Sequence, residues 1–268
     1  MLIAHISDLH IARAPLLAEY NAKRLLGYVN YRLFRGRVYR EYIAEEALAA
    51  LAEDPPDLVF LTGDITQHGL LAEFDAAERL LSVLTRHNIP IIAVPGNHDI
   101  YGAATAEYLK AFIDRLSLAV REGGDGIIRL PGVEILPLEQ GVQTLPFFSY
   151  GIQSEEELAR AAVAWADPPN GVMRLVIGHY PVIDSHGGRL LYFRGLREAS
   201  LLIDFCERHQ VAAYFCGHNH TRYVAAMPGG CVQYAAPALS CVRQAAEEWI
   251  SVYECDPALS RPVERERG

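Results

Sequence analysis

The sequence contains no paired-cysteine motif. No Cys-x-x-Cys spacing occurs among its five cysteines, which are Cys206, Cys216, Cys231, Cys241 and Cys255. An odd count in a chain without an evident export signal is typical of a protein whose thiols stay reduced. We therefore expect free thiols and a reducing compartment.

Long apolar runs are also missing. No segment approaches the roughly 18 consecutive apolar residues that a membrane-spanning helix needs. The first apolar run, which is typical of a strand, begins at residue 2 and leaves no room for a cleavable export segment. These absences predict a cytoplasmic protein, with any membrane contact limited to the surface.

Internal repeats and low-complexity linkers are absent, so nothing divides the chain. With 268 residues, 51% of them hydrophobic, it can bury a large core. We expect a single domain over residues 1–255 and a flexible tail at 256–268, which is polar, charged and contains two prolines. Strand-like runs alternate with helical patterns at 70–87, 103–120, 154–166 and 196–209, which indicates an α/β fold.

Basic residues are fewer than acidic ones, 24 against 33, which gives a formal net charge of −9. This balance disfavours nucleic acid as a partner, since an acidic surface repels a polyanion. Residues 21–40 are the exception, with six bases and no acid. Helical spacing places an apolar stripe on one face of this segment, formed by Leu25, Leu26, Val29 and Leu33. The pattern predicts a basic helical insertion at about 21–42, with Asn21 as its N-cap.

Five short polar motifs each follow a strand-like apolar run. The runs at 2–7, 57–62, 90–95, 173–177 and 211–216 end at Asp8-Leu9-His10, Gly63-Asp64, Gly96-Asn97-His98-Asp99, Gly178-His179 and Gly217-His218-Asn219-His220. Sheets of α/β proteins collect ligands at the carboxyl ends of their strands. Two carboxylates, one amide and four imidazoles would meet there, enough for two metal ions that share a bridging ligand.

These motifs, in this order, resemble the signature of the calcineurin-like metallophosphoesterases across residues 1–240. A lone Asp-x-His or Gly-Asp carries little information, whereas five motifs in order, each after a strand, rarely arise by chance. The version with Gly-Asn-His-Asp and Gly-His-x-His is most similar to the branch of class III cyclic-nucleotide and glycerophosphodiester phosphodiesterases. The resemblance implies a four-layer sandwich of two mixed β-sheets flanked by helices.

The resemblance also implies a role for each motif residue. One metal ion would be held by Asp8, His10, Asp64 and His220, and the other by Asp64, Asn97, His179 and His218, with Asp64 as the bridge. Oxygen and nitrogen ligands without thiolate favour two divalent or trivalent ions of Mn, Fe or Zn. In the family pattern a metal-held hydroxide attacks phosphorus. His98 stabilises the phosphoryl oxygens or protonates the leaving oxygen, and Asp99 fixes the His98 tautomer.

Three interpretations of the insertion follow. It packs on the body through its apolar stripe, with its arginines in solvent. It forms a lid over the metal site, with Arg32, Arg35 and Arg37 binding an anionic substrate. It makes a peripheral membrane or lipid contact through residues 21–40. Outside the insertion, His186 in the polar segment 184–188 is a further candidate for substrate contact.

The expected activity is hydrolysis of phosphodiester bonds by a dinuclear metal-dependent phosphoesterase. One alternative is a pyrophosphatase of a nucleotide-linked lipid or sugar, similar to UDP-diacylglucosamine hydrolases, although those typically carry Gly-Asn-Arg-Asp where this chain keeps His98. Two further alternatives are a phosphomonoesterase and a metal-poor scaffold protein. Scaffold members of this family typically lack some of the metal ligands. No ligand position is missing here. The natural substrate and the oligomeric state stay open.

Overall fold

The computed structural model of the chain describes residues 1–16, 19, 22–101, 105–117, 125–243 and 249–265. The helices are α1 (Ala22–Leu33), α2 (Glu41–Glu53), α3 (Leu71–Arg86), α4 (Ala106–Leu116), α5 (Glu155–Ala164) and α6 (Ala199–Arg208). The strands are β1 (Leu2–Ile6), β2 (Leu58–Leu61), β3 (Ile91–Ala93), β4 (Ile128–Leu130), β5 (Val133–Pro137), β6 (Gly151–Ile152), β7 (Met173–Ile177), β8 (Leu196–Arg197), β9 (Ala213–Cys216), β10 (Tyr223–Ala226), β11 (Val232–Ala235), β12 (Ser251–Glu254) and β13 (Val263–Arg265).

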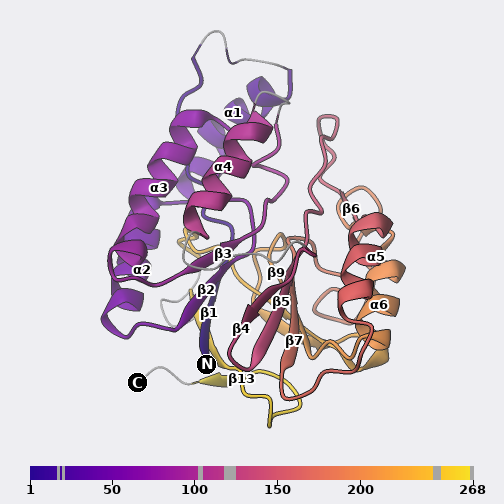
Figure 1. Ribbon diagram of the computed structural model, residues 1–268. Helices are drawn as coiled ribbons and strands as arrows, with labels where there is room; N and C mark the ends of the chain where they lie inside the picture. Colours follow the sequence, from indigo (N-terminus) through magenta and orange to yellow (C-terminus); the bar gives the residue numbers. More distant parts are fainter. Residues whose placement is uncertain (17–18, 20–21, 102–104, 118–124, 244–248, 266–268) are drawn as a thin grey trace.

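The strands form two large mixed sheets and one small one (Figure 1). The first sheet has the order β13-β12-β1-β2-β3, with β1, β2 and β3 parallel and β12 antiparallel to β1 and β13. The second has the order β10-β11-β9-β7-β5-β4 and is parallel except at its two antiparallel edges. The short strands β6 and β8 pair in parallel. In the first sheet the three neighbouring parallel strands β1, β2 and β3 end at motifs, and in the second sheet the two central strands β7 and β9 do.

A hydrophobic core lies between the two large sheets. Strand β2 shows how the sequence builds it, because Leu58 and Phe60 point into this core whereas Val59 and Leu61 belong to the core on the opposite face. This is the two-residue alternation that a strand imposes on its side chains. Phe215 of β9 enters the same central layer from the second sheet, with its ring centroid 5.1 Å from that of Phe60.

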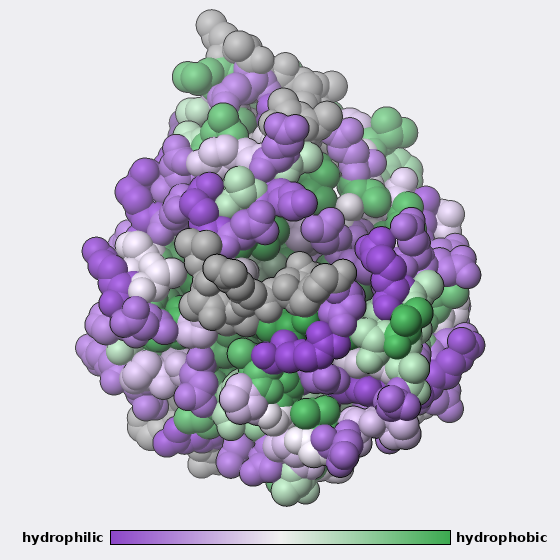
Figure 2. Space-filling view, viewed as in Figure 1, coloured by the Kyte–Doolittle hydropathy of each residue, from purple (hydrophilic) through white to green (hydrophobic). Residues whose placement is uncertain are grey.

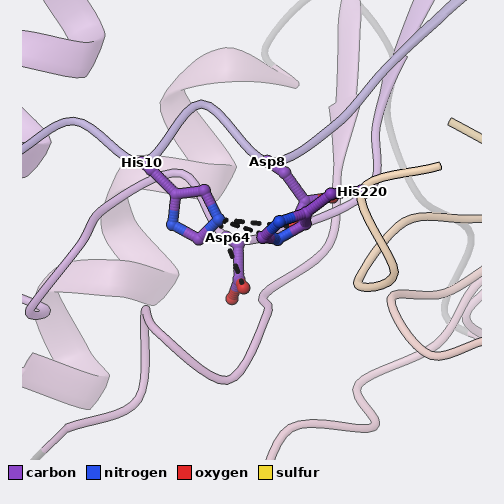
Figure 3. A group of neighbouring side chains, drawn as sticks. All are labelled: Asp8, His10, Asp64 and His220. Atoms are coloured by element: carbon purple, nitrogen blue, oxygen red, sulfur yellow. Dashed lines mark hydrogen bonds and ion pairs between the residues drawn. The ribbon is translucent and has the colours of Figure 1, made fainter. Parts of the chain in front are cut away.

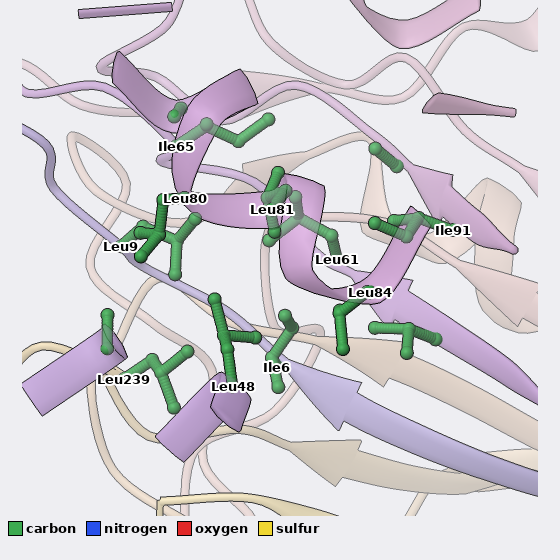
Figure 4. Close-up of a cluster of buried hydrophobic side chains, with 14 of the residues drawn as sticks. Ile6, Leu9, Leu48, Leu61, Ile65, Leu80, Leu81, Leu84, Ile91 and Leu239 are labelled. Atoms are coloured by element: carbon green, nitrogen blue, oxygen red, sulfur yellow. The ribbon is translucent and has the colours of Figure 1, made fainter. Parts of the chain in front are cut away.

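Helices cover the outer faces of both sheets and complete four layers (Figure 1). Helices α2, α3 and α4 pack on the first sheet, where leucines and isoleucines of the helices and strands interlock (Figure 4). Helices α5 and α6 pack on the second sheet around Trp165 and Phe205. Helix α5 begins where the Ser154 side chain accepts a hydrogen bond from Glu157 N–H, an N-cap arrangement. The predicted four-layer sandwich is confirmed.

Truncation of Phe60 should be among the most destabilising substitutions in the central core. The ring is completely buried between the sheets. Phe60→Ala removes its contacts and leaves a cavity, so we expect a loss of about 3–5 kcal/mol in the free energy of unfolding. Urea unfolding followed by circular dichroism checks this, with Phe148→Ala as the control because that ring is partly exposed. Equal losses in the two variants would contradict the described packing.

The sequence located the motif-bearing strands and the helices α1 and α3 to α6, but it gave no bounds for α2 or for the strands outside the motifs. Two of its predicted segments also differ from the structure. The prediction of a flexible tail at 256–268 is wrong in part, because Val263–Arg265 forms strand β13 against β12. The β12 backbone pairs with this strand, and the Tyr234 hydroxyl donates a hydrogen bond to Pro262 O just before it. The predicted helix 196–209 begins later, since Leu196–Arg197 forms β8. The ends of the predicted helix 103–120 and the Asn21 cap lie outside the described residues.

Two other expectations concern the whole chain. All five cysteines are free, as predicted, and all are buried. Within the described residues, no helix combines the length and apolar character that crossing a membrane requires.

Candidate metal centre

The motif residues lie in loops at the carboxyl ends of β1, β2, β3, β7 and β9. Nine non-glycine residues in the described part of the chain have positive φ, and five of them are predicted metal ligands: Asp8, His10, Asp64, His218 and His220. This left-handed conformation costs an ordinary side chain roughly 1–3 kcal/mol and persists where the surroundings enforce it, often at functional sites. The backbone is thus bent to aim these side chains at one another.

Two motif glycines allow the loops to approach so closely. A Cβ atom added at Gly96 would lie 2.2 Å from both Asp64 N and Asp64 Oδ1. One added at Gly217 would lie 1.9 Å from Ser7 Oγ and 2.5 Å from Asp8 Oδ2. Any side chain at either position would push these loops apart, so their close approach requires glycine at both.

A first ligand cluster joins Asp8, His10, Asp64 and His220, as Figure 3 shows. One potential ligand atom from each residue lies within 4.8 Å of the others. His220 Nε2 is 3.0 Å from Asp8 Oδ1 and 3.0 Å from His10 Nε2, and His10 Nε2 is 4.0 Å from Asp64 Oδ2. Two carboxylates and two imidazoles that converge in this way match the ligands of Mn, Fe or Zn.

A second cluster joins Asp64, His179 and His218 by the same distance criterion. His179 Nε2 lies 3.5 Å from Asp64 Oδ1 and 3.2 Å from His218 Nδ1. Asp64 therefore offers Oδ1 to this cluster and Oδ2 to the first one. That is the position expected for a bridging carboxylate.

The backbone and a tyrosine orient three of these imidazoles from behind. His179 Nδ1 donates to Thr62 O at 2.7 Å, and His218 Nε2 donates to Arg194 O at 2.8 Å. His220 Nδ1 lies 2.7 Å from the Tyr39 hydroxyl. In each ring the other nitrogen is left to face the cluster, which is how outer hydrogen bonds commonly fix the tautomer of a metal-binding histidine. Tyr39 comes from the insertion and was not predicted from the sequence.

Burial and the shared carboxylate control protonation in these clusters. Burial opposes a charged His179, but the nearby Asp64 carboxylate outweighs it and raises the pKa of His179 to about 9. Burial also lowers the pKa of His218 to about 3. Burial acts to raise the pKa of Asp64, but the neighbouring His179 outweighs it and is the main group that holds this pKa well below its usual range. The carboxylate is therefore ionised, as a metal ligand must be.

One buried oxygen of the site lacks a protein partner. Asn97 Oδ1 is buried and has no hydrogen-bond partner among the described residues. A buried amide oxygen without a hydrogen-bond donor costs free energy unless another group, such as a cation, binds it. Asn97 lines the same cavity as Asp64 and His218. An amide oxygen without a protein partner, beside two clusters of metal-type ligands, fits a divalent cation.

The structure corrects the predicted partnership of His98 and Asp99. The Asp99 carboxylate accepts hydrogen bonds from Ile65 N, Thr66 N, Thr66 Oγ1 and Gly96 N. It makes no hydrogen bond to the His98 ring in the described part of the chain. His98 Nδ1 instead donates to Gln67 O at 2.7 Å. Asp99 points away from the ring because it ties two motif loops together. Its role is to hold the loops, and the Gln67 carbonyl fixes the His98 tautomer.

A cavity of about 610 Å³ opens above the two clusters. Its floor includes Asp64, Asn97, His98, His218 and His220. One wall comes from the insertion and includes Leu26, Val29 and Leu33. The insertion is therefore part of the site.

Burial of the His98 ring lowers its pKa to about 4, so this ring is neutral near pH 7.

The interpretation that the insertion packs on the body through its apolar stripe is wrong, because a different face of the helix makes the contact. Helix α1 contacts the body through Arg24, which donates to His68 O and Gly69 O, and through Tyr28 and Tyr31, whose rings lie about 6 Å from that of His68. These residues recur every three to four positions and form one face of the helix. The apolar stripe is on a different face, and its side chains stay 45% or more exposed.

Only one of the three candidate arginines reaches the site. Arg35 lines the cavity, and its Nη1 lies 3.1 Å from His98 Nε2. Arg32 and Arg37 are exposed and do not line the cavity. His186 also does not line it, since it lies in an exposed turn closed by hydrogen bonds to Asp184 Oδ1. Arg32 belongs to α1, whereas Arg35 and Arg37 belong to the 3₁₀ helix Arg35–Arg37 that follows a break at Phe34. Within that short helix, residues two positions apart point to different sides.

The fold and this pair of linked ligand clusters define the class of the metallophosphoesterases. The calcineurin-like phosphoesterase family profile matches residues 1–222. The chain therefore belongs to the calcineurin-like phosphoesterase family. This membership confirms the enzyme class predicted from the motifs, the hydrolases of phosphoric esters.

Two curated relatives point to one branch of the family. The chain is 31% identical over 177 residues to the probable glycerophosphodiester phosphodiesterase GpdQ of Arcobacter nitrofigilis, covering 62% of this chain and 57% of that protein. It is 26% identical over 283 residues to the glycerophosphodiester phosphodiesterase GpdQ of Enterobacter lignolyticus, covering 94% of this chain and 90% of that protein. The alignment with the first relative thus spans little more than half of its length.

Solved structures share the fold at low identity. A dimetal phosphatase from Danio rerio has a TM-score of 0.64 at 13% identity, covering 95% of this chain and 92% of that one. TT1561 of Thermus thermophilus has a TM-score of 0.57 at 15% identity, covering 99% and 98%. Both support the two-sheet architecture.

Proposed function

We propose that this protein hydrolyses phosphodiesters with two bound metal ions. The observation that carries the proposal is the position of Asp64, whose two carboxylate oxygens face two separate clusters of ligands. The first ion would be held by Asp8, His10, Asp64 and His220, and the second by Asp64, Asn97, His179 and His218. Mn, Fe and Zn suit these ligands.

A bound metal pair would neutralise the anionic ester and acidify a water molecule. The protein's own residues supply the remaining functions. Arg35 and His98 line the same cavity, with Arg35 Nη1 3.1 Å from His98 Nε2. The guanidinium could therefore donate to phosphoryl oxygens of a bound ester, and His98 Nε2 could serve its leaving oxygen. An arriving anion would favour a proton on Nε2, which the ring can then give to the leaving oxygen.

The diester preference rests on the branch of the family. Both curated relatives are named as glycerophosphodiester phosphodiesterases. The chain also keeps His98 in the Gly-Asn-His-Asp motif. We further propose that the single domain predicted for residues 1–255 is one catalytic unit that extends through β13, because both large sheets contribute ligands to the same site. Cytoplasmic location stays a prediction.

A substrate panel tests the proposed reaction. Methyl p-nitrophenyl phosphate, p-nitrophenyl phosphate and a nucleoside diphosphate sugar represent diester, monoester and pyrophosphate. Each is assayed with Mn²⁺ after metal removal by chelation. We expect the largest kcat/KM for the diester and no turnover without metal. A larger kcat/KM for the pyrophosphate would replace the proposal by the pyrophosphatase alternative.

Neutralising Arg35 should weaken substrate binding far more than neutralising its neighbour Arg37. Both arginines belong to the short 3₁₀ helix Arg35–Arg37, but only Arg35 lines the cavity. A hydrogen bond to a charged group contributes about 1.5–3 kcal/mol, so Arg35→Gln should lower kcat/KM by roughly 10- to 150-fold. Arg37→Gln should leave it within a factor of about two. Steady-state kinetics check this, and equal effects would contradict the assigned position of Arg35.

A further inference from the structure

The apolar stripe of α1 faces the cavity without a covering protein surface. The helix is anchored by its other face, through Arg24, Tyr28 and Tyr31. Leu26, Val29 and Leu33, spaced three and four residues apart, line the cavity while remaining 46%, 45% and 58% exposed. Groups of exposed apolar side chains beside a cavity commonly mark a binding surface.

An aromatic loop forms the opposite wall. Residues 146–149 line the cavity across from α1, and Phe147 is 89% exposed. In the space-filling view, hydrophobic side chains gather at the tip of this loop, at the upper right of the molecule (Figure 2). Phe147 has a φ of 71°, a costly conformation for a phenylalanine. The loop is held in place by Ser149 N–H donating to Phe193 O and by Thr144 Oγ1 donating to Phe148 O.

The floor and the walls of the cavity differ in charge. Asp64 is the only acidic residue among the described residues that line it, and it lies on the floor with the metal ligands. Arg35 and Arg194 are the lining cations. The floor thus suits a phosphate, whereas the walls above it suit an uncharged apolar group.

We propose that the substrates are phosphodiesters in which one ester group is an apolar chain, which lies between the apolar stripe of α1 and the 146–149 loop. This inference rests on the proposed phosphodiesterase function and names its substrate class. A glycerol-sized ester would leave both walls in water, whereas a chain would cover them. Each fully buried methylene group increases binding about fourfold. The cavity volume of about 610 Å³ lies within the range of small-molecule sites.

A homologous series of substrates measures the effect directly. Methyl, butyl and octyl p-nitrophenyl phosphate share one leaving group and are used below their aggregation concentrations. Water adds to phosphorus, the bond to p-nitrophenolate breaks, and an alkyl phosphate remains. We expect kcat/KM to rise by roughly 10- to 100-fold from methyl to octyl, since the chain is covered on two sides and open above. Inhibition by methyl- and octylphosphonate gives the same trend without any leaving group.

Single substitutions in the walls then assign the effect. Leu33→Ser and Phe147→Ser change side chains that are mostly exposed, so folding is preserved. Each should lower kcat/KM for the octyl ester several-fold more than kcat/KM for the methyl ester, so that the octyl-to-methyl ratio falls. Val163→Ser is the matched control, because Val163 is 81% exposed on α5, outside the cavity.

Three outcomes would overturn the inference. The first is a flat series in the wild-type protein that still hydrolyses the methyl ester, which leaves the phosphodiesterase proposal intact. The second is an equal loss with methyl and octyl esters in the wall variants. The third is a flat series together with a change of oligomeric state in Leu33→Ser, measured by light scattering, which would mean that a second copy covers the stripe. Failure of the methyl ester itself would instead contradict the proposed function.

Discussion

Asp64→Ala should abolish turnover and lower the metal content of the purified protein. Asp64 is almost completely buried and is the one carboxylate shared by the two clusters. Its removal takes a ligand from each site and leaves the surrounding positive charges without their common counter-charge. Both ions would then repel each other without a bridge. Elemental analysis and hydrolysis of methyl p-nitrophenyl phosphate measure the two effects.

The control for this variant is Asp204→Ala, which removes an exposed carboxylate on α6. It should keep the wild-type rate and metal content. Asp64→Asn keeps the shape of the side chain, so a loss in both Asp64 variants with an unchanged circular dichroism spectrum reports charge and not folding. An Asp64→Ala protein with the wild-type rate and metal content would refute the bridging role.

His98→Ala should lower kcat by roughly 10²–10⁴-fold, the usual contribution of a general acid or base. Metal content should change little, because the backbone N–H of His98 donates to Asp64 Oδ1 at 2.8 Å and that bond does not need the ring. The loss should be greater for an alkoxide leaving group than for p-nitrophenolate, which leaves without a proton. The kinetics of dialkyl and alkyl p-nitrophenyl phosphates test this difference.

His87→Ala is the matched control, since His87 lies exposed at the end of α3 and donates to Val83 O. Its kinetics should equal those of the wild type. Equal losses across leaving groups in His98→Ala would rule out proton donation and assign the ring to electrostatic stabilisation with Arg35. A large loss of metal in that variant would place the ring among the ligands.

The clustering of the candidate metal ligands could be predicted because their signals are local, whereas their division between two ions came from the family resemblance. Each follows an apolar run, and a parallel sheet brings the ends of such runs to one edge. The positions of residues such as Asp64 and His179 could therefore be predicted without knowledge of tertiary contacts. The pairing of β13 with β12 could not be predicted in the same way, because Val263–Arg265 is exposed and has no apolar pattern.

The residues around the ligands were missed for a related reason. Tyr39 meets His220 across 181 positions of sequence, and the Gln67 carbonyl meets His98 across 31. No local pattern marks a tyrosine or a backbone carbonyl as a partner of a distant histidine. The orientation of α1 was also hidden, since the sequence shows an apolar face but not that Arg24 and two tyrosines anchor the helix by another face.

Anomalous scattering from crystals of the Mn²⁺-loaded protein tests the central claim most directly. Data collected on the two sides of the manganese absorption edge locate the ions without reference to activity. We predict two peaks, one among Asp8, His10, Asp64 and His220, and the other among Asp64, Asn97, His179 and His218. A single peak, or peaks that do not share Asp64, would contradict the dinuclear centre.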